Sequence, residues 1–368
     1  MKISRIEIWK LDMPIRAPFR IATMVMDRVR SILVRITTHE GLAGWGEACP
    51  FRTVTGETQG ICAAAARDLA PELLGKNPVE ADALSRFMER YLPHNTTTRC
   101  AFDMAIHDIA AQAAHLPLYR YFLGDKRRLE IDVTITHPDP SAAAELAMRA
   151  VSEGYGVLKV KIGWDPTEDY VRLAKISMAV GPGVPLRLDA NQGYADADAA
   201  LEALRRFAEF NVEFCEQPVP AQDIKGMKRV TEFSPIRIMA DESLFTPREA
   251  ERLAEEKACD YFNVKLSKAG GLEAVATIAR IATAADIPCM MGGSLETRLG
   301  LTASAHLASA FPIFKFLDLD GSYDHARDDV IGGIRIKPPQ IILPESPGLG
   351  AAYPDEETTD MRKIVDLH

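Results

Sequence analysis

The chain has 368 residues, of which 47% are hydrophobic and 26% charged, as in folded globular proteins. This length predicts either two domains or one large barrel with an appendage. The formal net charge of -9 argues against nucleic acid or an anionic membrane as a partner, because both require a basic surface. Residues 1–15 alternate charged and apolar positions, which predicts neither a signal peptide nor a membrane span, and we therefore expect a cytoplasmic protein.

The N-terminal part of the chain predicts a mixed α+β unit. Strand-like runs lie at residues 3–13 and 30–48. Ala, Leu and Ile recur at helical spacing over residues 58–74 and 98–114. We therefore expect an α+β domain over residues 1–125.

From residue 131 onwards, short apolar runs alternate with amphipathic stretches. The runs begin at residues 131, 158, 186, 212, 236, 261, 287 and 314. Their spacing fits one strand, one helix and two loops per unit. Eight such units predict a closed parallel (β/α) barrel over residues 126–325. An open doubly wound sheet is the alternative, although no G-x-G-x-x-G motif follows an early strand.

The last segment, residues 326–368, shows no strong helical repeat. Gly and Pro interrupt it at "IGGIRIKPP" and "PESPGLG". We expect this segment to pack back on the N-terminal unit. The six cysteines form no C-x-x-C pair, and we expect them to be reduced and mostly buried.

Acidic side chains stand at the ends of three consecutive strands of the predicted barrel. They are Asp189, Glu216 and Asp241. Catalytic groups of such barrels lie at the C-terminal ends of the strands, so these carboxylates should converge. Converging carboxylates repel one another unless a hard divalent cation neutralises them, which favours Mg²⁺, with Mn²⁺ as a substitute. For each acid taken alone, the alternative is a solvated carboxylate or a helix N-cap.

Lysines flank these acids on the second and sixth strands. In "LKVKIG", Lys159 and Lys161 are two residues apart and so share one face of a strand, and Lys265 and Lys268 follow the sixth strand. A free lysine is too basic to accept a proton at neutral pH. A neighbouring ammonium and a metal ion both destabilise the protonated form, so we expect Lys159 to tune Lys161. An ordinary salt-bridged pair is the alternative.

Together these motifs resemble the enolase superfamily, in its muconate-lactonizing subgroup. The resemblance covers nearly the whole chain and rests on "KVKIG", "LDANQGY", "CEQP", "ADES", "NVKLSKAGG" and "GGSLET", in this order. It implies the fold class α/β, namely a modified (β/α)7β TIM barrel with an N-terminal α+β capping domain. It also implies a homo-oligomer.

The resemblance further implies a division of roles among the polar residues. Mg²⁺ bound by the three acids would hold a substrate carboxylate and stabilise the enolate. Lys161 and Lys265 would lie on opposite faces of the adjacent carbon, so that one removes a proton and the other returns one. The residues expected behind the ligands and the catalytic lysines are Lys159, Asn191, Glu242 and Lys268.

The eighth predicted strand limits the class of substrate. "FLDLDGS" contains Asp318-x-Asp320, which is similar to the D-x-D motif that holds the ammonium group in dipeptide epimerases. Two carboxylates complement a cation and not an anionic tail. The alternative for either aspartate is a loop cap. The remaining alternatives for the enzyme are an N-succinyl or N-acylamino-acid racemase, an o-succinylbenzoate synthase and a muconate-type cycloisomerase.

Two loops of the capping domain should close over the substrate's side chains. The substrate-binding residues that we expect, besides the aspartates, are Phe19, Met24 and Arg52 from these loops and Glu296 from "GGSLET". Met24 stands where related Ala-Glu epimerases have an arginine, and this favours an apolar second residue. Arg20, Arg28 or Arg52 are the alternatives that would reach an acidic side chain.

The positions of the histidines argue against a related subgroup of the superfamily, in which a His-Asp pair replaces the second lysine. His137, His306 and His325 are the histidines near or after the predicted barrel strands, and none lies at the end of the seventh strand. The sixth strand carries Lys265 instead. We therefore do not expect sugar-acid dehydration.

Overall fold

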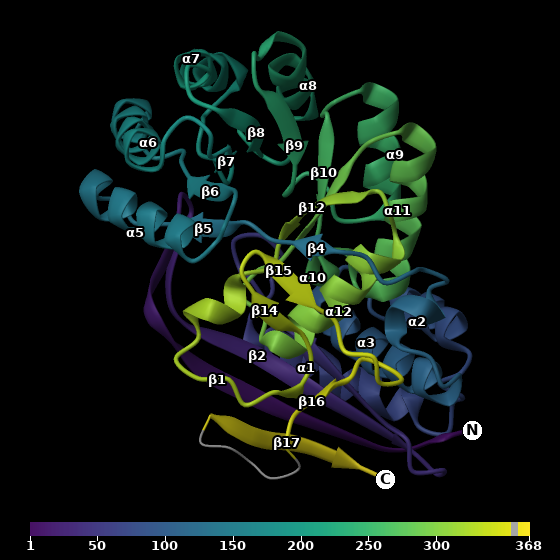
Figure 1. Ribbon diagram of the computed structural model, residues 1–368. Coiled ribbons are helices and arrows are strands. Elements are labelled where there is room, and N and C mark those ends of the chain that lie inside the picture. Colours follow the sequence, from purple (N-terminus) through teal and green to yellow (C-terminus); the bar gives the residue numbers. More distant parts are fainter. Residues whose placement is uncertain (355–359) are drawn as a thin grey trace.

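The computed structural model describes residues 1–354 and 360–368. An antiparallel sheet with helices on one side lies beside a ring of parallel strands surrounded by helices (Figure 1). None of the helices in the described ranges is both long and apolar enough to cross a membrane.

The antiparallel sheet joins the two ends of the chain. Its strand order is β17-β1-β2-β3. The strands are β1 (Ile3–Ile21), β2 (Met24–Thr38), β3 (Ala43–Ala48) and β17 (Met361–Leu367). The helices α1 (Gln59–Leu73), α2 (Ala81–Tyr91) and α3 (Thr96–Ala113) belong to the same unit. The C-terminal strand pairs with β1, with Ile8 opposite Val365, so the end of the chain does return to the N-terminal unit.

Helix α3 packs directly on the backbone of β3. A Cβ atom at Gly44 would lie 2.1 Å from the carbonyl oxygen of Ala105, and one at Gly46 would lie 1.8 Å from that of Ala101. Only glycine permits this approach. The "AGWGEA" stretch is therefore a contact surface between strand and helix.

The predicted barrel is present. Within the described residues, eight parallel strands have the order β12-β11-β10-β9-β8-β7-β6-β5. They are β5 (Val133–Ile135), β6 (Leu158–Lys161), β7 (Leu186–Asp189), β8 (Val212–Glu216), β9 (Arg237–Ala240), β10 (Tyr261–Val264), β11 (Cys289–Gly292) and β12 (Phe314–Asp318). The Asp132 amide donates to the Leu317 carbonyl at 3.2 Å and connects the first strand to the last, which rules out the open sheet.

Helices follow the strands around the outside of the ring. They are α5 (Pro140–Ser152), α6 (Pro166–Val180), α7 (Ala197–Phe207), α8 (Ile224–Phe233), α9 (Pro247–Glu256), α10 (Leu266–Ala269), α11 (Leu272–Ala285) and α12 (Arg298–Ala310). The short helix α4 (Leu118–Tyr121) comes before the first barrel strand and packs against α12. Their starts have local causes. The Asp139 and Asp165 carboxylates cap α5 and α6, and Thr246 and Glu249 form a capping box at α9.

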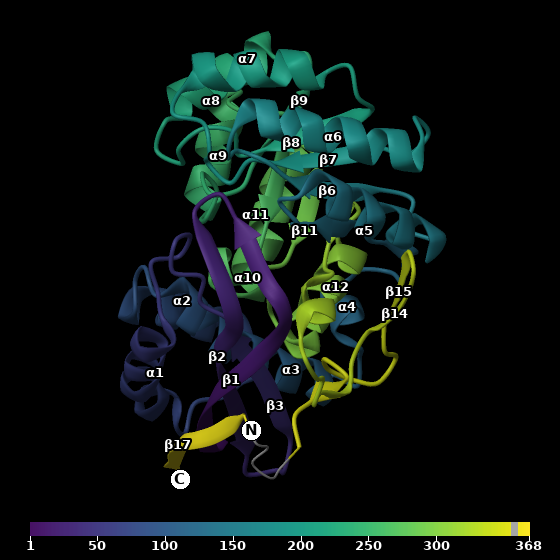
Figure 2. The ribbon, with the colours of Figure 1, turned by 90° about the vertical axis from the view of Figure 1, so that its left-hand side faces the viewer.

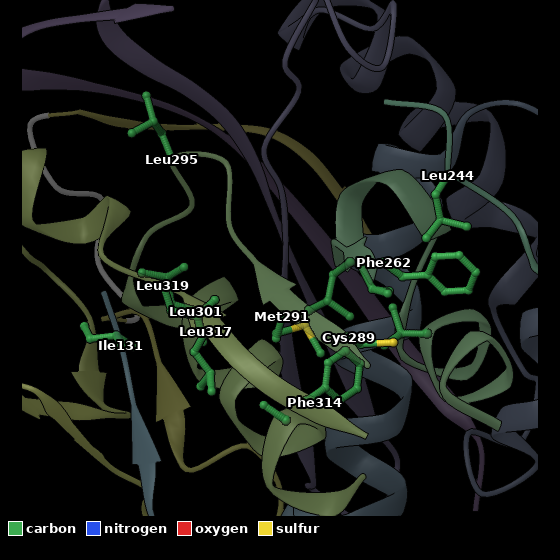
Figure 3. Packing of buried hydrophobic residues seen from close by; sticks show 14 of the residues in the cluster. Ile131, Leu244, Phe262, Cys289, Met291, Leu295, Leu301, Phe314, Leu317 and Leu319 are labelled. Carbon is green, nitrogen blue, oxygen red and sulfur yellow. The ribbon is translucent and has the colours of Figure 1, made fainter. Parts of the chain in front are cut away.

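Alternate residues of the strands fill two separate apolar regions. Cys289, Met291 and Phe314 lie together between strands and helices (Figure 3). The strand residues that alternate with this outer set point into the ring. There, Phe214, Met239 and Met290, from three different strands, form a cluster of their own. The interior of the barrel below the C-terminal ends of its strands is therefore filled with side chains. This leaves the C-terminal ends for a binding site.

The segment after the barrel forms short pairs. The elements are a 3-10 helix (Gly321–Asp324), β13 (Ile331–Gly332), β14 (Arg335–Lys337), β15 (Gln340–Ile342) and β16 (Ala351–Ala352). Strand β15 pairs with β4 (Leu129–Glu130), so this segment also contacts the start of the barrel. Part of the predicted C-terminal segment, residues 355–359, lies outside the described residues, and the domain boundaries stay predictions.

Two features differ from the expectation for the N-terminal unit. The first capping loop, residues 18–28, is the end of a β-hairpin, because β1 and β2 continue to Ile21 and Met24. Apart from the buried Ile21, its side chains are exposed or half-buried, and Met24, Val25 and Met26 are three apolar residues in a row, so the sequence lacks the regular alternation that would signal a strand. Helix α2 was also not predicted. In Figure 2 the hairpin reaches from the sheet to the barrel.

Candidate active site

A cavity lies where the hairpin meets the C-terminal ends of the barrel strands. Its lining residues are Phe19, Ile21, Phe51, Val54, Thr134, Lys161, Asn191, Lys265, Gly293, Ser294, Asp318, Asp320 and Gly321. The capping unit supplies the apolar residues, and the barrel supplies most of the charged ones. Phe19 also lies under the Lys161 ammonium, which is 5.9 Å from the centre of its ring.

Strand register brings the polar residues to one level. Lys161 lies opposite Asp189, and Asp189 lies opposite Glu216, in consecutive parallel pairs. Side chains alternate along a strand, so these three share the inner face. Glu216 and Asp189 are fully buried and Lys161 is nearly so.

Each lysine that lines the cavity is paired with a different acid. Lys161 Nζ donates to Asp189 Oδ2 at 2.6 Å, and Lys265 Nζ donates to Asp241 Oδ2 at 2.8 Å. Strands β6 and β10 are four places apart in a ring of eight, so the two ammonium groups approach the cavity from opposite sides.

Lys159 is a buried cation surrounded by carboxylates. Its Nζ lies 2.6 Å from Asp318 Oδ2, 2.8 Å from Glu216 Oε2 and 3.1 Å from Asp189 Oδ2. Burial lowers the pKa of Lys159, but attraction to Asp318, Glu216 and Asp189 outweighs it and raises the pKa well above the usual value. Lys159 is therefore a fixed positive charge, and it shares Asp189 Oδ2 with Lys161.

The surroundings of the three acids that were predicted as metal ligands shift their pKa values in different directions. Burial raises the pKa of Asp189, but Lys161 and Lys159 lower it to about 2. Burial also opposes the effect of Lys265 and Lys268 on Asp241, whose pKa nevertheless falls well below its usual range.

Glu216 behaves in the opposite way. Burial, together with repulsion from Asp189, raises its pKa well above the usual value. Its Oε1 accepts a hydrogen bond from Asn263 Nδ2 at 2.6 Å. Asn263 was missed by the sequence analysis, although it lies two residues before Lys265 and so faces the same way.

The residues expected behind the ligands also lie in this region. Lys268 Nζ contacts Asp241 Oδ1 and donates to the backbone carbonyl of Asn263 at 3.1 Å. Asn191 Nδ2 donates to Glu242 Oε1 at 3.2 Å. Burial and repulsion from Asp241 raise the pKa of Glu242 to about 7.

A second residue missed from the sequence is Gln217, in "CEQP". Its Oε1 accepts from the backbone amides of Asp241 and Ser243 at 3.0 and 3.1 Å. Its Nε2 donates to Ser243 Oγ at 2.8 Å. Gln217 has a φ of 37°, in the left-handed region, and this bend lets its side chain join the ends of β8 and β9. An interior Gln next to a predicted ligand was the available signal.

The aspartates of the eighth strand line the same cavity but have different partners. Asp318 accepts from Lys159, as described above. Asp320 Oδ2 accepts from the backbone amide of Thr134 at 2.7 Å. Burial and repulsion from Asp318 raise the pKa of Asp320 well above the usual value. The edge of the cavity formed by Asp320 therefore favours a positively charged group.

Three of the expected substrate-binding residues do not line this cavity. Met24 and Arg52 line a neighbouring hollow with Leu295. Glu296 is buried, and its Oε2 accepts from the backbone amide of Ser294 at 2.6 Å. Burial raises the pKa of Glu296 to about 7. Among the predicted side-chain contacts, the structure brings only Phe19 to the cavity wall.

The donor set suits a hard divalent cation. Asp189, Glu216 and Asp241 offer only oxygen, and they are completely buried. The raised pKa of Glu216, caused by burial and by repulsion from Asp189, fits a place where a cation would be favoured. Lys161 and Lys265 each donate to one oxygen of Asp189 and Asp241, so an ion would share these carboxylates with the two lysines.

Two family models match the chain. The model for the "Mandelate racemase / muconate lactonizing enzyme, N-terminal domain" matches residues 5–124, and the model described as "Enolase C-terminal domain-like" matches residues 142–357.

Known proteins resemble the chain over nearly its full length. It is 35% identical to the D-Ala-D/L-Ala epimerase of Cytophaga hutchinsonii over 99% of both chains. It is 38% identical to the L-Ala-D/L-Glu epimerase of Bacillus subtilis, over 95% of this chain and 96% of that one. A crystal structure of a dipeptide epimerase from Cytophaga hutchinsonii with Mg and the dipeptide D-Ala-L-Val matches with a TM-score of 0.97, at 34% identity over all of both chains.

Proposed function

Because the chain belongs to the mandelate racemase and muconate lactonizing enzyme family of the enolase superfamily, we propose that it is a Mg²⁺-dependent dipeptide epimerase. It inverts the α-carbon of the C-terminal residue of its substrate. The observation that carries this proposal is one cavity lined by Lys161, Lys265 and Asp320.

Lys161 and Lys265 move the proton. In one direction, the neutral amine of one lysine takes the α-proton as the C–H bond breaks, and the ammonium of the other delivers a proton to the opposite face of the carbon. The configuration is thereby inverted, and each lysine ends with the charge of its partner. The placement of β6 and β10 on opposite sides of the ring supports this assignment.

Asp189, Glu216 and Asp241 would hold the Mg²⁺ ion. When bound, the ion supplies positive charge that binds the substrate carboxylate and makes the adjacent carbon more acidic. Lys159 lowers the pKa of Asp189 and opposes the rise in the pKa of Glu216, and Lys268 lowers the pKa of Asp241. Asn263 orients Glu216 by its hydrogen bond to Oε1.

The free ammonium of the dipeptide would bind at the aspartates. Asp320 is the better candidate, because Asp318 already neutralises Lys159. A substrate ammonium beside Asp320 would relieve the repulsion between the two aspartates, and this complementarity favours a dipeptide over an N-acyl amino acid.

The side chain at the inverted carbon is apolar under this proposal. Phe19, Ile21, Phe51 and Val54 form the cover of the cavity, and the arginines of the capping unit do not line it. Arg20 instead lies over Trp164, at 5.5 Å from the ring centre. An acidic side chain would therefore meet no fixed cation at this cover.

The test is α-proton exchange in D2O. We expect Mg²⁺-dependent mass gain and epimerisation with dipeptides that have an apolar second residue. Asp320→Asn keeps an oxygen for the Thr134 amide but removes the charge, so KM for dipeptides should rise about tenfold to a hundredfold. N-succinyl and N-acyl amino acids serve as the control substrates. Turnover of these alone, or an unchanged KM for dipeptides in Asp320→Asn, would contradict the proposal.

Assembly and location follow the family expectation. We propose that the protein forms a homo-oligomer in the cytoplasm. Light scattering coupled to gel filtration measures the oligomeric state. A monomer at micromolar protein concentration would contradict the proposed assembly.

A further inference from the structure

A second group of metal-ligating side chains lies outside the barrel. Within residues 1–354 and 360–368, Asp82, His107 and Glu273 offer donor atoms that all lie within 4.8 Å of one another. They come from α2, α3 and α11, which meet where the capping unit contacts the barrel (Figure 1). The proposed catalysis uses none of them.

His107 is oriented as a ligand would be. Its Nδ1 lies 2.9 Å from the backbone carbonyl oxygen of Asp103. A carbonyl oxygen only accepts hydrogen bonds, so Nδ1 carries the hydrogen and the lone pair of the neutral ring lies on Nε2. Metal-binding histidines commonly donate their other ring N–H to a carbonyl or carboxylate in this way. The ring is also stacked on Phe122, with centres 5.4 Å apart.

Among residues 1–354 and 360–368, the Nε2 atom of His107 has no hydrogen-bond partner. The side chain is 0% exposed, and a buried polar atom without a partner is costly. Since Nδ1 already contacts Asp103, Nε2 is the ring nitrogen left to bind an ion. Asp82 is exposed and Glu273 is partly buried, so the group is open to solvent on one side.

The donor set selects the kind of ion. One imidazole nitrogen and two carboxylates suit a borderline divalent cation such as Zn²⁺, whereas Mg²⁺ prefers oxygen alone. Ligands across one Zn²⁺ are at most ~4.2 Å apart, twice the usual bond length. The spacing of the three donor atoms, within 4.8 Å, is close to that limit, and the exposed Asp82 side chain is free of surrounding packing on its solvent side.

Two existing interactions compete with such an ion. Arg280 Nη1 lies 3.3 Å from Glu273 Oε1. Burial lowers the pKa of His107, but attraction to Asp103 raises it to about 9, so binding must also displace a proton. The alternative to a metal site is thus an ion pair between a protonated His107 and its acidic neighbours.

We propose that Asp82, His107 and Glu273 form a Zn²⁺ site that fastens the capping unit to the barrel. Lys265 directly precedes α10, which carries Lys268, and α11 begins shortly after α10. Asp103 on α3 already holds the start of α11 by accepting from the Leu272 amide at 2.6 Å. The ion would add a further connection among α2, α3 and α11.

Zinc binding tests the proposal independently of epimerase activity. The whole protein, saturated with Mg²⁺, is dialysed against Zn²⁺, and bound metal is measured for wild type, Asp82→Asn, Glu273→Gln and the control Glu255→Gln. Glu255 is an exposed carboxylate on α9. We expect wild type and the control to bind one more Zn²⁺ per chain than the other two variants at low Zn²⁺, with affinity at least tenfold lower in each variant. Equal binding in all four proteins would overturn the site.

Anomalous diffraction of Zn²⁺-soaked crystals locates the ion. The proposal predicts a peak about 2.0–2.2 Å from His107 Nε2 and from oxygens of Asp82 and Glu273. A peak confined to the barrel acids, or no peak, would leave His107 as a member of an ion pair only and would overturn the proposal.

Discussion

At the scale of single residues, the candidate site is organised by charge balance. Lys159 contacts Asp318, Glu216 and Asp189 at once, and none of the four side chains is more than slightly exposed. The tuning of Lys161 by Lys159 stays a prediction. In the structure, Lys159 contacts acids of two different predicted functions, metal binding and ammonium binding.

Replacing Lys159 by Met tests this balance. The variant keeps most of the length of the side chain but removes the charge that compensates three buried carboxylates, so we expect a loss of about 3–5 kcal/mol in the free energy of unfolding. Urea denaturation measures it. Lys175→Met, at an exposed lysine that donates to Ser141, is the control and should change stability by less than about 0.5 kcal/mol. Equal stability of both variants would contradict the assignment.

A buried histidine predicts how stability depends on pH. His306 uses both ring nitrogens in its neutral form: Nδ1 accepts from the Tyr119 amide at 3.3 Å, and Nε2 donates to the Leu349 carbonyl at 3.1 Å. Burial lowers its pKa to about 4. The unfolded chain, with a pKa near 6.5, therefore binds the proton more tightly, and stability falls as pH drops from 6.5 to 4.

The loss from His306 alone should reach about 3 kcal/mol. His306→Gln removes the titrating ring and should flatten this part of the pH profile in urea unfolding measured between pH 7.5 and 4. The exposed His39→Gln is the control and should keep the wild-type slope. A slope that His306→Gln leaves unchanged would show that another group is responsible.

At the scale of elements, the capping unit holds the loop before α12 through one carboxylate. Glu47 on β3 accepts from Thr297 Oγ1 at 2.7 Å, from the Gly300 amide at 3.3 Å and from Ser31 Oγ at 2.8 Å. Burial raises the pKa of Glu47, although these donors oppose the rise. The loop that ends at Thr297 contributes Gly293 and Ser294 to the cavity, so its position matters for the substrate.

Glu47→Gln should weaken this attachment. The amide NH2 group of glutamine cannot accept the hydrogen bonds that the replaced carboxylate oxygen accepts. We therefore expect the free energy of unfolding to fall by about 1–3 kcal/mol and KM to rise. Thermal unfolding and initial rates measure the two effects. The control Thr297→Ser keeps the hydroxyl donor, so its loss of stability and its rise in KM should both be smaller than those of Glu47→Gln. If Glu47→Gln matched wild type in both measurements, the carboxylate would not position the loop.

The sequence predicted the elements of the barrel better than those of the capping unit. Strands β6, β7 and β10 begin at the predicted residues 158, 186 and 261, because buried parallel strands are continuous apolar runs. The β1–β2 hairpin was predicted as a loop beyond Pro18 because most of its side chains there are exposed or half-buried, and backbone hydrogen bonding leaves no trace in the sequence. The position of Met24, and of the hollow that it lines with Arg52, depends on that hairpin and could not be predicted without it.

At the scale of the whole molecule, the barrel and the capping unit make one cavity from residues far apart in the chain. The barrel contributes its charged side and the capping unit its apolar cover. Strand order and period-two alternation predict which barrel residues converge, so the acids and lysines could be predicted. Asn263 and Gln217 could not be ranked above other polar residues, since their importance lies in hydrogen bonds between neighbouring strands.

Mg²⁺ should stabilise the whole protein. Binding to the folded state alone raises the free energy of unfolding by about 2.7 kcal/mol when Mg²⁺ is at a hundredfold its Kd. Asp241→Asn should abolish most of this gain, while Glu255→Gln should retain it. Thermal unfolding with Mg²⁺ and with EDTA measures the effect. A gain that survives in Asp241→Asn would place the stabilising ion elsewhere.

The proposed mechanism requires two lysines that act on opposite faces of one carbon, and single-lysine variants test this requirement. Each epimer of an active dipeptide is incubated in D2O with Lys161→Ala or Lys265→Ala. We expect epimerisation to fall by about 10²–10⁴-fold in both variants. Each variant should still exchange the α-proton of one epimer only, and the two variants should act on opposite epimers. Exchange of the same epimer by both variants, or continued epimerisation by either, would contradict the two-lysine mechanism.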